Sequence, residues 1–155
     1  MKRGAVCVLS RPSIEPVMFD IPLHLLIIHF PIALTIVAFS YDGWAVYAKR
    51  PELNDVGYGL TLWAGVFALT SVVTGLQIAG LAQIGKGPVT EHALYGIFSS
   101  IVLAVVGFLR YSARAKQQGP DENYSILWLV LQAVAVLLIV TAVITGHRLV
   151  VGLLG

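Results

Sequence analysis

Residues 21–34 read IPLHLLIIHFPIAL and open an apolar run that continues to about Tyr47. An α-helix needs about 20 such residues to cross the hydrocarbon core of a bilayer, and this run exceeds that length. Its first turns also carry two histidines, His24 and His29. An imidazole in hydrocarbon needs a hydrogen-bond partner, a metal or water, because an unpartnered polar group there costs about 1–3 kcal/mol or more. The stretch therefore predicts a membrane-spanning helix whose histidines bind a polar partner or a metal.

The composition fits a polytopic membrane protein. Of 155 residues, 57% are hydrophobic and 12% are charged, whereas soluble domains average about 25% charged residues. The net charge of +2 is small and its basic residues are scattered, which argues against nucleic-acid binding. The single cysteine, Cys7, excludes a disulfide framework, covalent haem attachment and a four-thiolate iron–sulfur site. Any iron cofactor would be held by histidine.

The apolar pattern predicts an N-terminal tail over residues 1–20 and one domain over residues 21–155. Polar connections divide this domain into four spans, at about residues 21–47, 56–84, 92–111 and 124–149. We expect Asp20 and Thr90 to cap the first and third spans, and Pro120-Asp121 to precede the fourth. Short connections join antiparallel neighbours, so the predicted fold is an all-α, integral membrane, up-down-up-down four-helix bundle.

This topology places all four histidines on one side of the membrane. The connections on the opposite side hold five basic residues close to a span: Lys49, Arg50, Arg110, Arg114 and Lys116. Basic residues favour the cytoplasmic side. We therefore expect a bacterial plasma-membrane protein with periplasmic termini and periplasmic histidines. The tryptophans, Trp44, Trp63 and Trp128, and most tyrosines fall at the inner boundary, as an aromatic belt would.

The histidines are the residues most suited to chemistry. His24 and His29 are five residues apart, about 140° around a helix, so they face different grooves. His29 lies deeper, and Pro31 releases the carbonyl of Ile27 near it. On the third span, His92 shares one face with Tyr95 and Gly96.

Small residues near the histidines leave room for a cofactor. A glycine one turn below a histidine, as at Gly96, leaves a slot for a flat macrocycle, and Gly75 offers a similar position at this depth. Close helix packing is the alternative explanation for both glycines. Four polar side chains at this depth are candidates to bind imidazole N–H groups or a quinone, with hydrogen bonding between helices as the default explanation: Thr74, Gln77, Thr141 and Thr145.

The residues suggest a b-type haem between spans, with two imidazoles as axial ligands. His29 and His92 are the preferred pair, because the first and third spans are parallel and face each other across a bundle. His24 and His147 are expected at headgroup level, as propionate partners or as a second axial pair, with Lys86 or Arg148 near the propionates. For each histidine the alternative is an interfacial ring bonded to a carbonyl or water. Asp42 is expected to be solvated or paired with Arg110 at the inner boundary, in preference to acting as a proton relay.

The opening segment from His24 to Leu34, HLLIIHFPIAL, resembles the HPxxxHFPIAL opening of small bacterial four-span membrane proteins grouped as domain of unknown function 2231. The resemblance covers about Asp20 to Gly155, and residues 145–150 (TGHRLV) resemble the family's closing GGxLVY-like segment. Leu25 stands where the family usually has proline, His147 falls within the closing glycine pair, and Val151 replaces a common tyrosine. Similar domains lie fused or adjacent to Rieske and cytochrome c modules, so the resemblance implies an association with redox proteins.

Together these features predict an electron-transfer subunit that binds haem b near the outer side and exchanges electrons with a quinone or a partner cytochrome. The protein would not be an enzyme by itself. One alternative is a cofactor-free structural or assembly subunit. Another is a copper or zinc site built from three of the four histidines, against which the lack of histidine pairs at helical i, i+4 spacing counts.

Overall fold

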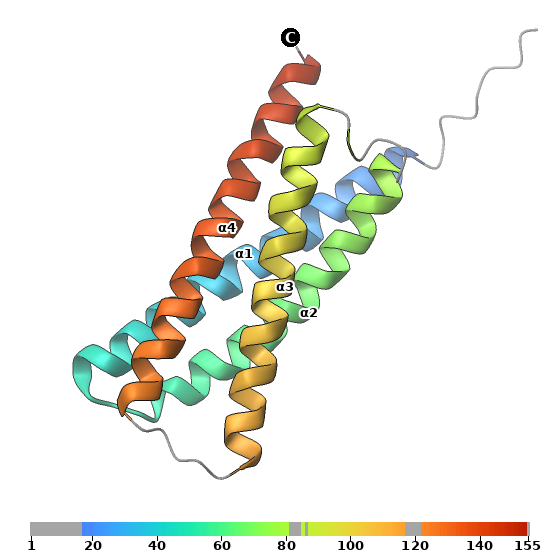
Figure 1. Ribbon diagram of the computed structural model, residues 1–155. Coiled ribbons are helices and arrows are strands. Elements are labelled where there is room, and N and C mark those ends of the chain that lie inside the picture. Colours follow the sequence, from blue (N-terminus) through green and yellow to red (C-terminus); the bar gives the residue numbers. More distant parts are fainter. Residues whose placement is uncertain (1–16, 81–84, 86, 117–121, 155) are drawn as a thin grey trace, which may run out of the picture.

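The chain forms four long α-helices in up-down-up-down order (Figure 1). The structure is a computed structural model that describes residues 17–80, 85, 87–116 and 122–154. The helices are α1 (Val17–Ala48), α2 (Leu53–Ala79), α3 (Pro88–Ala115) and α4 (Glu122–Leu154). Each contains a segment long and apolar enough to cross a membrane, and no strand occurs in the described ranges. The predicted all-α four-span bundle is confirmed.

Two helix starts differ from the sequence prediction. Helix α1 begins at Val17, one turn before Asp20, so the expected cap at Asp20 is wrong. Helix α3 begins at Pro88, because proline suits the first turn, where its missing N–H leaves no bond unmade. Thr90 is therefore inside the helix, and its hydroxyl accepts a hydrogen bond from the Gly85 N–H at 2.8 Å. The tail up to residue 16 and the predicted turn at residues 120–121 lie outside the described residues.

The second span is shorter than the apolar pattern suggests. Helix α2 ends at Ala79 instead of near Ile84, because Gly80 adopts a φ of +70°, which an α-helix cannot continue. The Gly80 N–H donates to the Leu76 carbonyl at 2.9 Å and closes the last turn. The sequence predicts a longer span because the residues after Gly80 are still largely apolar. Their composition does not reveal that the backbone turns at Gly80.

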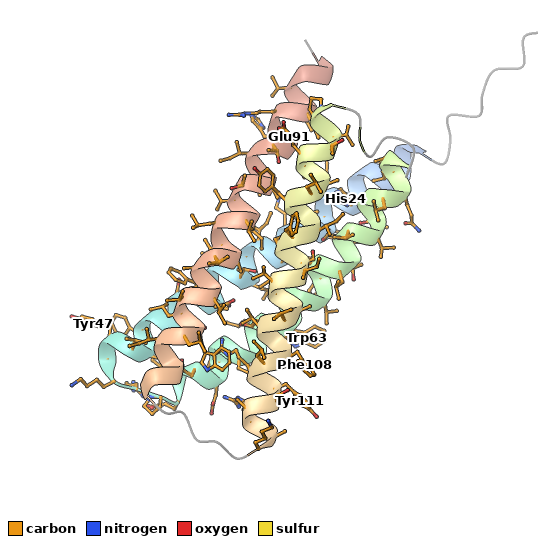
Figure 2. All side chains as sticks on the ribbon, in the orientation of Figure 1. His24, Tyr47, Trp63, Glu91, Phe108 and Tyr111 are labelled. Carbon is orange, nitrogen blue, oxygen red and sulfur yellow. The ribbon has the colours of Figure 1, made fainter. Side chains whose placement is uncertain are left out.

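The four helices pack as two hairpins, α1 with α2 and α3 with α4. The hairpins meet through α2 against α3 and α1 against α4, so α1 and α3 are diagonal to one another. Figure 1 shows the starts of α1 and α3 and the end of α4 at one end of the bundle. This is the end that carries the histidines, and His24 and Glu91 mark it in Figure 2, with Tyr47 and Tyr111 at the opposite end.

Small side chains fill the bundle interior, while large apolar side chains cover its outside. The central cluster consists of Ala64, Ala68, Leu103, Ala135 and Ile139. Outward-facing residues such as Leu26, Phe108 and Leu137 are 61%, 66% and 67% exposed. This inversion of the soluble pattern is expected for helices in lipid, since small residues let the backbones approach and lipid tails solvate the large ones.

Candidate functional site

The buried face of α1 separates the two histidines of the opening stretch. Its buried residues recur every three or four positions, at Pro31, Thr35, Ala38, Asp42 and Ala45. His24 lies two helical turns before Pro31 and so shares this face, whereas His29 is displaced by about 200° around the helix. Accordingly His24 is half-buried and His29 is exposed. The histidine that points into the bundle is the shallower one.

His24 is held by α2. Its Nδ1 lies 2.8 Å from the hydroxyl oxygen of Thr74. That hydroxyl is within 3.1 Å of the carbonyls of Thr70 and Ser71, to which it donates its single proton. With the hydroxyl proton directed to one of these carbonyls, Thr74 accepts from Nδ1 of His24. The ring also packs on Gly75, where an added Cβ would lie only 3.1 Å from the imidazole Cε1.

His92 is held in the same way by α4. Its Nδ1 lies 2.9 Å from the carbonyl oxygen of Ala142, which accepts only, so Nδ1 carries the proton. The ring packs on Gly146, where an added Cβ would lie 2.9 Å from the imidazole Cε1. Each hairpin thus seats a histidine of its first helix on a glycine of its second helix.

His24 and His92 lie at the same end of the bundle, on the diagonal helices α1 and α3. In the tautomer with Nδ1 protonated, which the carbonyl partner of His92 requires and the hydroxyl partner of His24 allows, Nε2 is the lone-pair nitrogen available to a ligand. A protonated Nδ1 bound to a fixed acceptor is also the usual support for a metal-ligating histidine.

The other predicted site residues lie elsewhere. His29 faces outward, and its Nδ1 donates to the Leu25 carbonyl of its own helix. It lines a shallow apolar pocket with Phe30, Ala33 and Leu34, all from α1. His147 and Tyr95 are both exposed. The expected pairing of His29 with His92 therefore has no counterpart in the structure, because the helical register turns His29 away from α3.

Gly96 lies one turn below His92, at the centre of the buried face of α3. An added Cβ there would meet no atom of the described residues within 4 Å. This contrasts with Gly75 and Gly146, whose space the imidazoles occupy. No described side chain therefore covers the Cβ position of Gly96, where the sequence suggested a slot.

A common interval of 18 residues, five helical turns or about 27 Å, links the two ends of all four helices. It separates His24 from Asp42, and His92 from Arg110. It also separates the two glycines that contact Asp42 and His24, Gly57 and Gly75, and the two residues that contact Arg110 and His92, Trp128 and Gly146. The hairpins thus resemble two copies of one unit, with matched positions at both ends.

Asp42 and Arg110 form a buried ion pair at the end opposite the histidines. Arg110 NH1 donates to Asp42 Oδ2 at 2.7 Å, and NH2 donates to Oδ1 at 2.8 Å. The residues are 0% and 3% exposed, respectively. The predicted pairing with Arg110 is confirmed, but the pair is inside the bundle instead of at a solvated boundary.

Polar groups from α2 and α4 complete the surroundings of this pair. Arg110 also donates to the carbonyl of Asn54 at 3.0 Å and to the Thr61 hydroxyl at 3.3 Å, and its guanidinium lies 5.7 Å from the Trp128 ring centre. Gln132 Nε2 donates to the same Thr61 hydroxyl at 2.9 Å. Sequence reasoning missed Thr61 and Gln132. Each lies three residues before a buried alanine on the same helix, Ala64 and Ala135, and this spacing is the signal that places them inside.

The three-histidine metal site finds no support in the described part of the chain. No group of three or more histidine, cysteine, aspartate or glutamate side chains gathers there around a common point. Lys86 lies outside the described residues, and Arg148 is exposed near the histidine end of α4. The candidate ligand-binding groups at the histidine end are the imidazoles of His24 and His92, each packed on a glycine.

Comparison with known proteins identifies a family without assigning an activity. No curated protein and no solved structure gave a significant match to the chain. A family model described as "Predicted membrane protein (DUF2231)" matches residues 20–153, which covers all four spans. The chain is therefore a member of the DUF2231 family of predicted membrane proteins.

Proposed function

We propose that this protein is a b-type-cytochrome-like electron-transfer subunit, with His24 and His92 as the axial ligands of one haem b. The observation that carries the proposal is the matched setting of two imidazoles on diagonal helices. Each ring donates from Nδ1 to a partner on its own hairpin, at 2.8 Å for His24 and 2.9 Å for His92. Each therefore presents an unprotonated Nε2, the nitrogen that binds iron in such sites.

The surrounding residues suit a flat macrocycle in two respects. An added Cβ at Gly96, one turn from His92, would meet no described atom within 4 Å. The related positions of His24 and His92 in the two hairpins also suit a ligand whose two faces are alike. Binding would require the hairpins to admit the ring between α1 and α3, which are the diagonal helices of the bundle.

The protein's own residues would set the properties of such a site. Haem b, when bound, supplies a one-electron couple at its iron. Thr74 and the Ala142 carbonyl fix the tautomer and orientation of the two imidazoles. Gly75 and Gly146 let the rings sit against the neighbouring backbones. The apolar cluster around Leu103 separates this site from the polar groups at the other end.

The electron partner is proposed to be a quinone in the bilayer or a cytochrome c or Rieske protein at the outer surface. The histidine end faces the periplasm in this proposal, because the basic residues concentrate at the opposite end. A bacterial plasma membrane is the proposed location. The lipid bilayer itself is a partner that the four apolar helices establish.

The test is a reduced-minus-oxidised absorption spectrum of the protein purified in detergent from cells supplied with haem precursor. We expect the bands of a low-spin b-type haem in the wild type. His24→Ala and His92→Ala should each abolish them, because each removes one axial nitrogen. His29→Ala and His147→Ala serve as matched controls and should retain the bands, since both rings are exposed.

Three results would contradict this assignment. Loss of the bands in His29→Ala with retention in His24→Ala would return the ligand role to His29. A wild-type protein with no haem bands but with stoichiometric copper or zinc would indicate a metal site instead. A folded wild-type protein with neither haem nor metal would favour the cofactor-free structural or assembly subunit, in which the imidazoles only join the helices of each hairpin.

A further inference from the structure

Gln132 presents a buried oxygen that no side chain or backbone group satisfies. The residue is 0% exposed, and its Oε1 has no hydrogen-bond partner among the described residues. Exchanging the amide oxygen and nitrogen does not remove the problem. Thr61 donates its only hydroxyl proton to the Gly57 carbonyl at 2.7 Å, so it can only accept from Gln132. Nε2 must face Thr61, and Oε1 therefore points away from the ion pair.

The hydroxyl oxygen of Thr35 is a second buried atom without a hydrogen-bond partner among the described residues. Thr35 is also 0% exposed, and its Oγ1 has no partner within the described part of the chain. This is unusual in these helices, because other threonines, such as Thr70 and Thr141, bond to the carbonyl four residues earlier. A buried hydroxyl without any partner costs about 1–3 kcal/mol.

The two oxygens belong to helices that pack together and lie at neighbouring depths. Helices α1 and α4 are in contact. Thr35 is seven residues, about 10 Å, from Asp42 towards the middle of the bundle. Gln132 is one turn, about 6 Å, from Trp128, which lies beside Arg110 at the level of Asp42.

We propose that one internal water molecule binds between Gln132 Oε1 and Thr35 Oγ1 and bridges α4 to α1. Water is the ligand that suits an orphaned acceptor beside an orphaned hydroxyl, because it donates to the first and also donates to or accepts from the second. Lipid tails cannot satisfy either atom. The water site does not depend on haem binding at the other end.

This water extends a polar route from the membrane boundary to the middle of the bundle. Exposed Arg114 and Asp55 form an ion pair at the boundary, and further inward hydrogen bonds join Asp42, Arg110, Thr61 and Gln132. The route stops at the apolar cluster of Ala64, Leu103 and Ile139. The inner half of the protein is thus proposed to be internally hydrated and its outer half to be shut off from that water.

The experiment compares Thr35→Val with Thr70→Val in thermal unfolding of the full chain in lipid nanodiscs. Both variants replace a hydroxyl with a methyl group of similar size, but Thr70 is exposed and bonds to its own helix. If Thr35 binds water, Thr35→Val should lower the melting temperature by about 2–4 °C relative to the control, the shift expected for one lost hydrogen bond in a chain of this size. If the hydroxyl is dry and unpartnered, the substitution should raise the melting temperature, which would overturn the proposal.

A second measurement establishes whether the two residues share one water. Gln132→Met should also lower the melting temperature, and the double variant with Thr35→Val should lose less than the sum of the two single variants. Water-to-protein magnetisation transfer in NMR should detect a long-lived water at Thr35 in the wild type and not in Gln132→Met. Strictly additive effects together with no such water signal would reject a shared site.

Discussion

Arg110 of α3 donates two parallel hydrogen bonds to Asp42 of α1, and both side chains lie inside the bundle, at 3% and 0% exposure. Among the described residues, no other side-chain hydrogen bond joins these two diagonal helices. Because α1 and α3 otherwise barely touch, the pair fixes how one hairpin lies against the other. A bidentate arginine–carboxylate pair has the directional geometry for that purpose.

Removing one member of this pair should destabilise the protein strongly. Asp42→Asn or Arg110→Gln leaves the other charge buried without compensation, which costs about 3–5 kcal/mol. Asp55→Asn is the control, because it breaks an exposed pair with Arg114 worth about 0–1 kcal/mol. Unfolding in mixed detergent should show this difference, and equal losses in the buried and exposed variants would contradict the buried position of the pair.

Gly57 and Gly59 should respond oppositely to alanine. An added Cβ at Gly57 would lie 2.2 Å from Asp42 Oδ1, so Gly57→Ala should displace the carboxylate and cost about 1–3 kcal/mol. At Gly59 it would meet no described atom within 4 Å, and Gly59→Ala should stabilise the helix by about 0.5–1 kcal/mol. Melting temperatures of the two variants test the prediction, which fails if both shift in the same direction.

Gly96→Leu should separate haem binding from folding. A Cβ at Gly96 would meet no described atom within 4 Å, and we expect the melting temperature of the haem-free variant to change little. If haem occupies that space, the variant should bind less of it. Gly59→Leu is the matched control, since it also adds leucine in open space but near the opposite end of the bundle. Normal haem content in Gly96→Leu would place the macrocycle elsewhere.

Gly146→Ala should disturb His92 whether or not haem binds. Its Cβ would lie 2.9 Å from Cε1 and 3.0 Å from Nδ1 of the ring, so the imidazole must move away from Ala142. The tautomer of His92, read from imidazole ¹⁵N chemical shifts, should change from pure Nδ1–H to a mixture. Gly43→Ala, whose Cβ meets only Leu129 Cδ1 at 3.7 Å, should leave those shifts unaltered.

The orientation in the membrane is tested by cysteine labelling of intact cells. In a Cys7→Ser background, Glu91→Cys marks the histidine end and Glu52→Cys marks the opposite end, and both positions are exposed. A membrane-impermeant maleimide should label Glu91→Cys only, if the histidine end is periplasmic. The reverse pattern would place the histidines in the cytoplasm.

The number, order and approximate limits of the helices could be predicted because a membrane span is recognised by length and apolarity alone. The limits themselves depended on backbone geometry. Gly80 ends α2 inside a stretch that still looks apolar, and Pro88 starts α3 four residues before His92. Neither feature changes the hydropathy of the chain, so neither was visible in it.

Depth in the membrane does not by itself predict which of His24 and His29 faces the bundle interior. Depth favoured His29, but the interior of a helix bundle is decided by angular position around the helix. The buried positions Thr35 and Asp42 are eleven and eighteen residues after His24, close to whole numbers of turns. Taking Asp42 as an interior residue would have pointed to His24. The predicted Asp42–Arg110 contact was correct because opposite charges in apolar helices have few other partners.

The equal spacing of five turns makes the chain tolerant of many substitutions but intolerant of changes in length. Inserting or deleting a single residue between His24 and Asp42 would rotate one of them by about 100° relative to the other. Either the imidazole or the carboxylate would then face lipid tails, however conservative the inserted residue. The residue spacing therefore couples the orientations of two polar sites that lie about 27 Å apart.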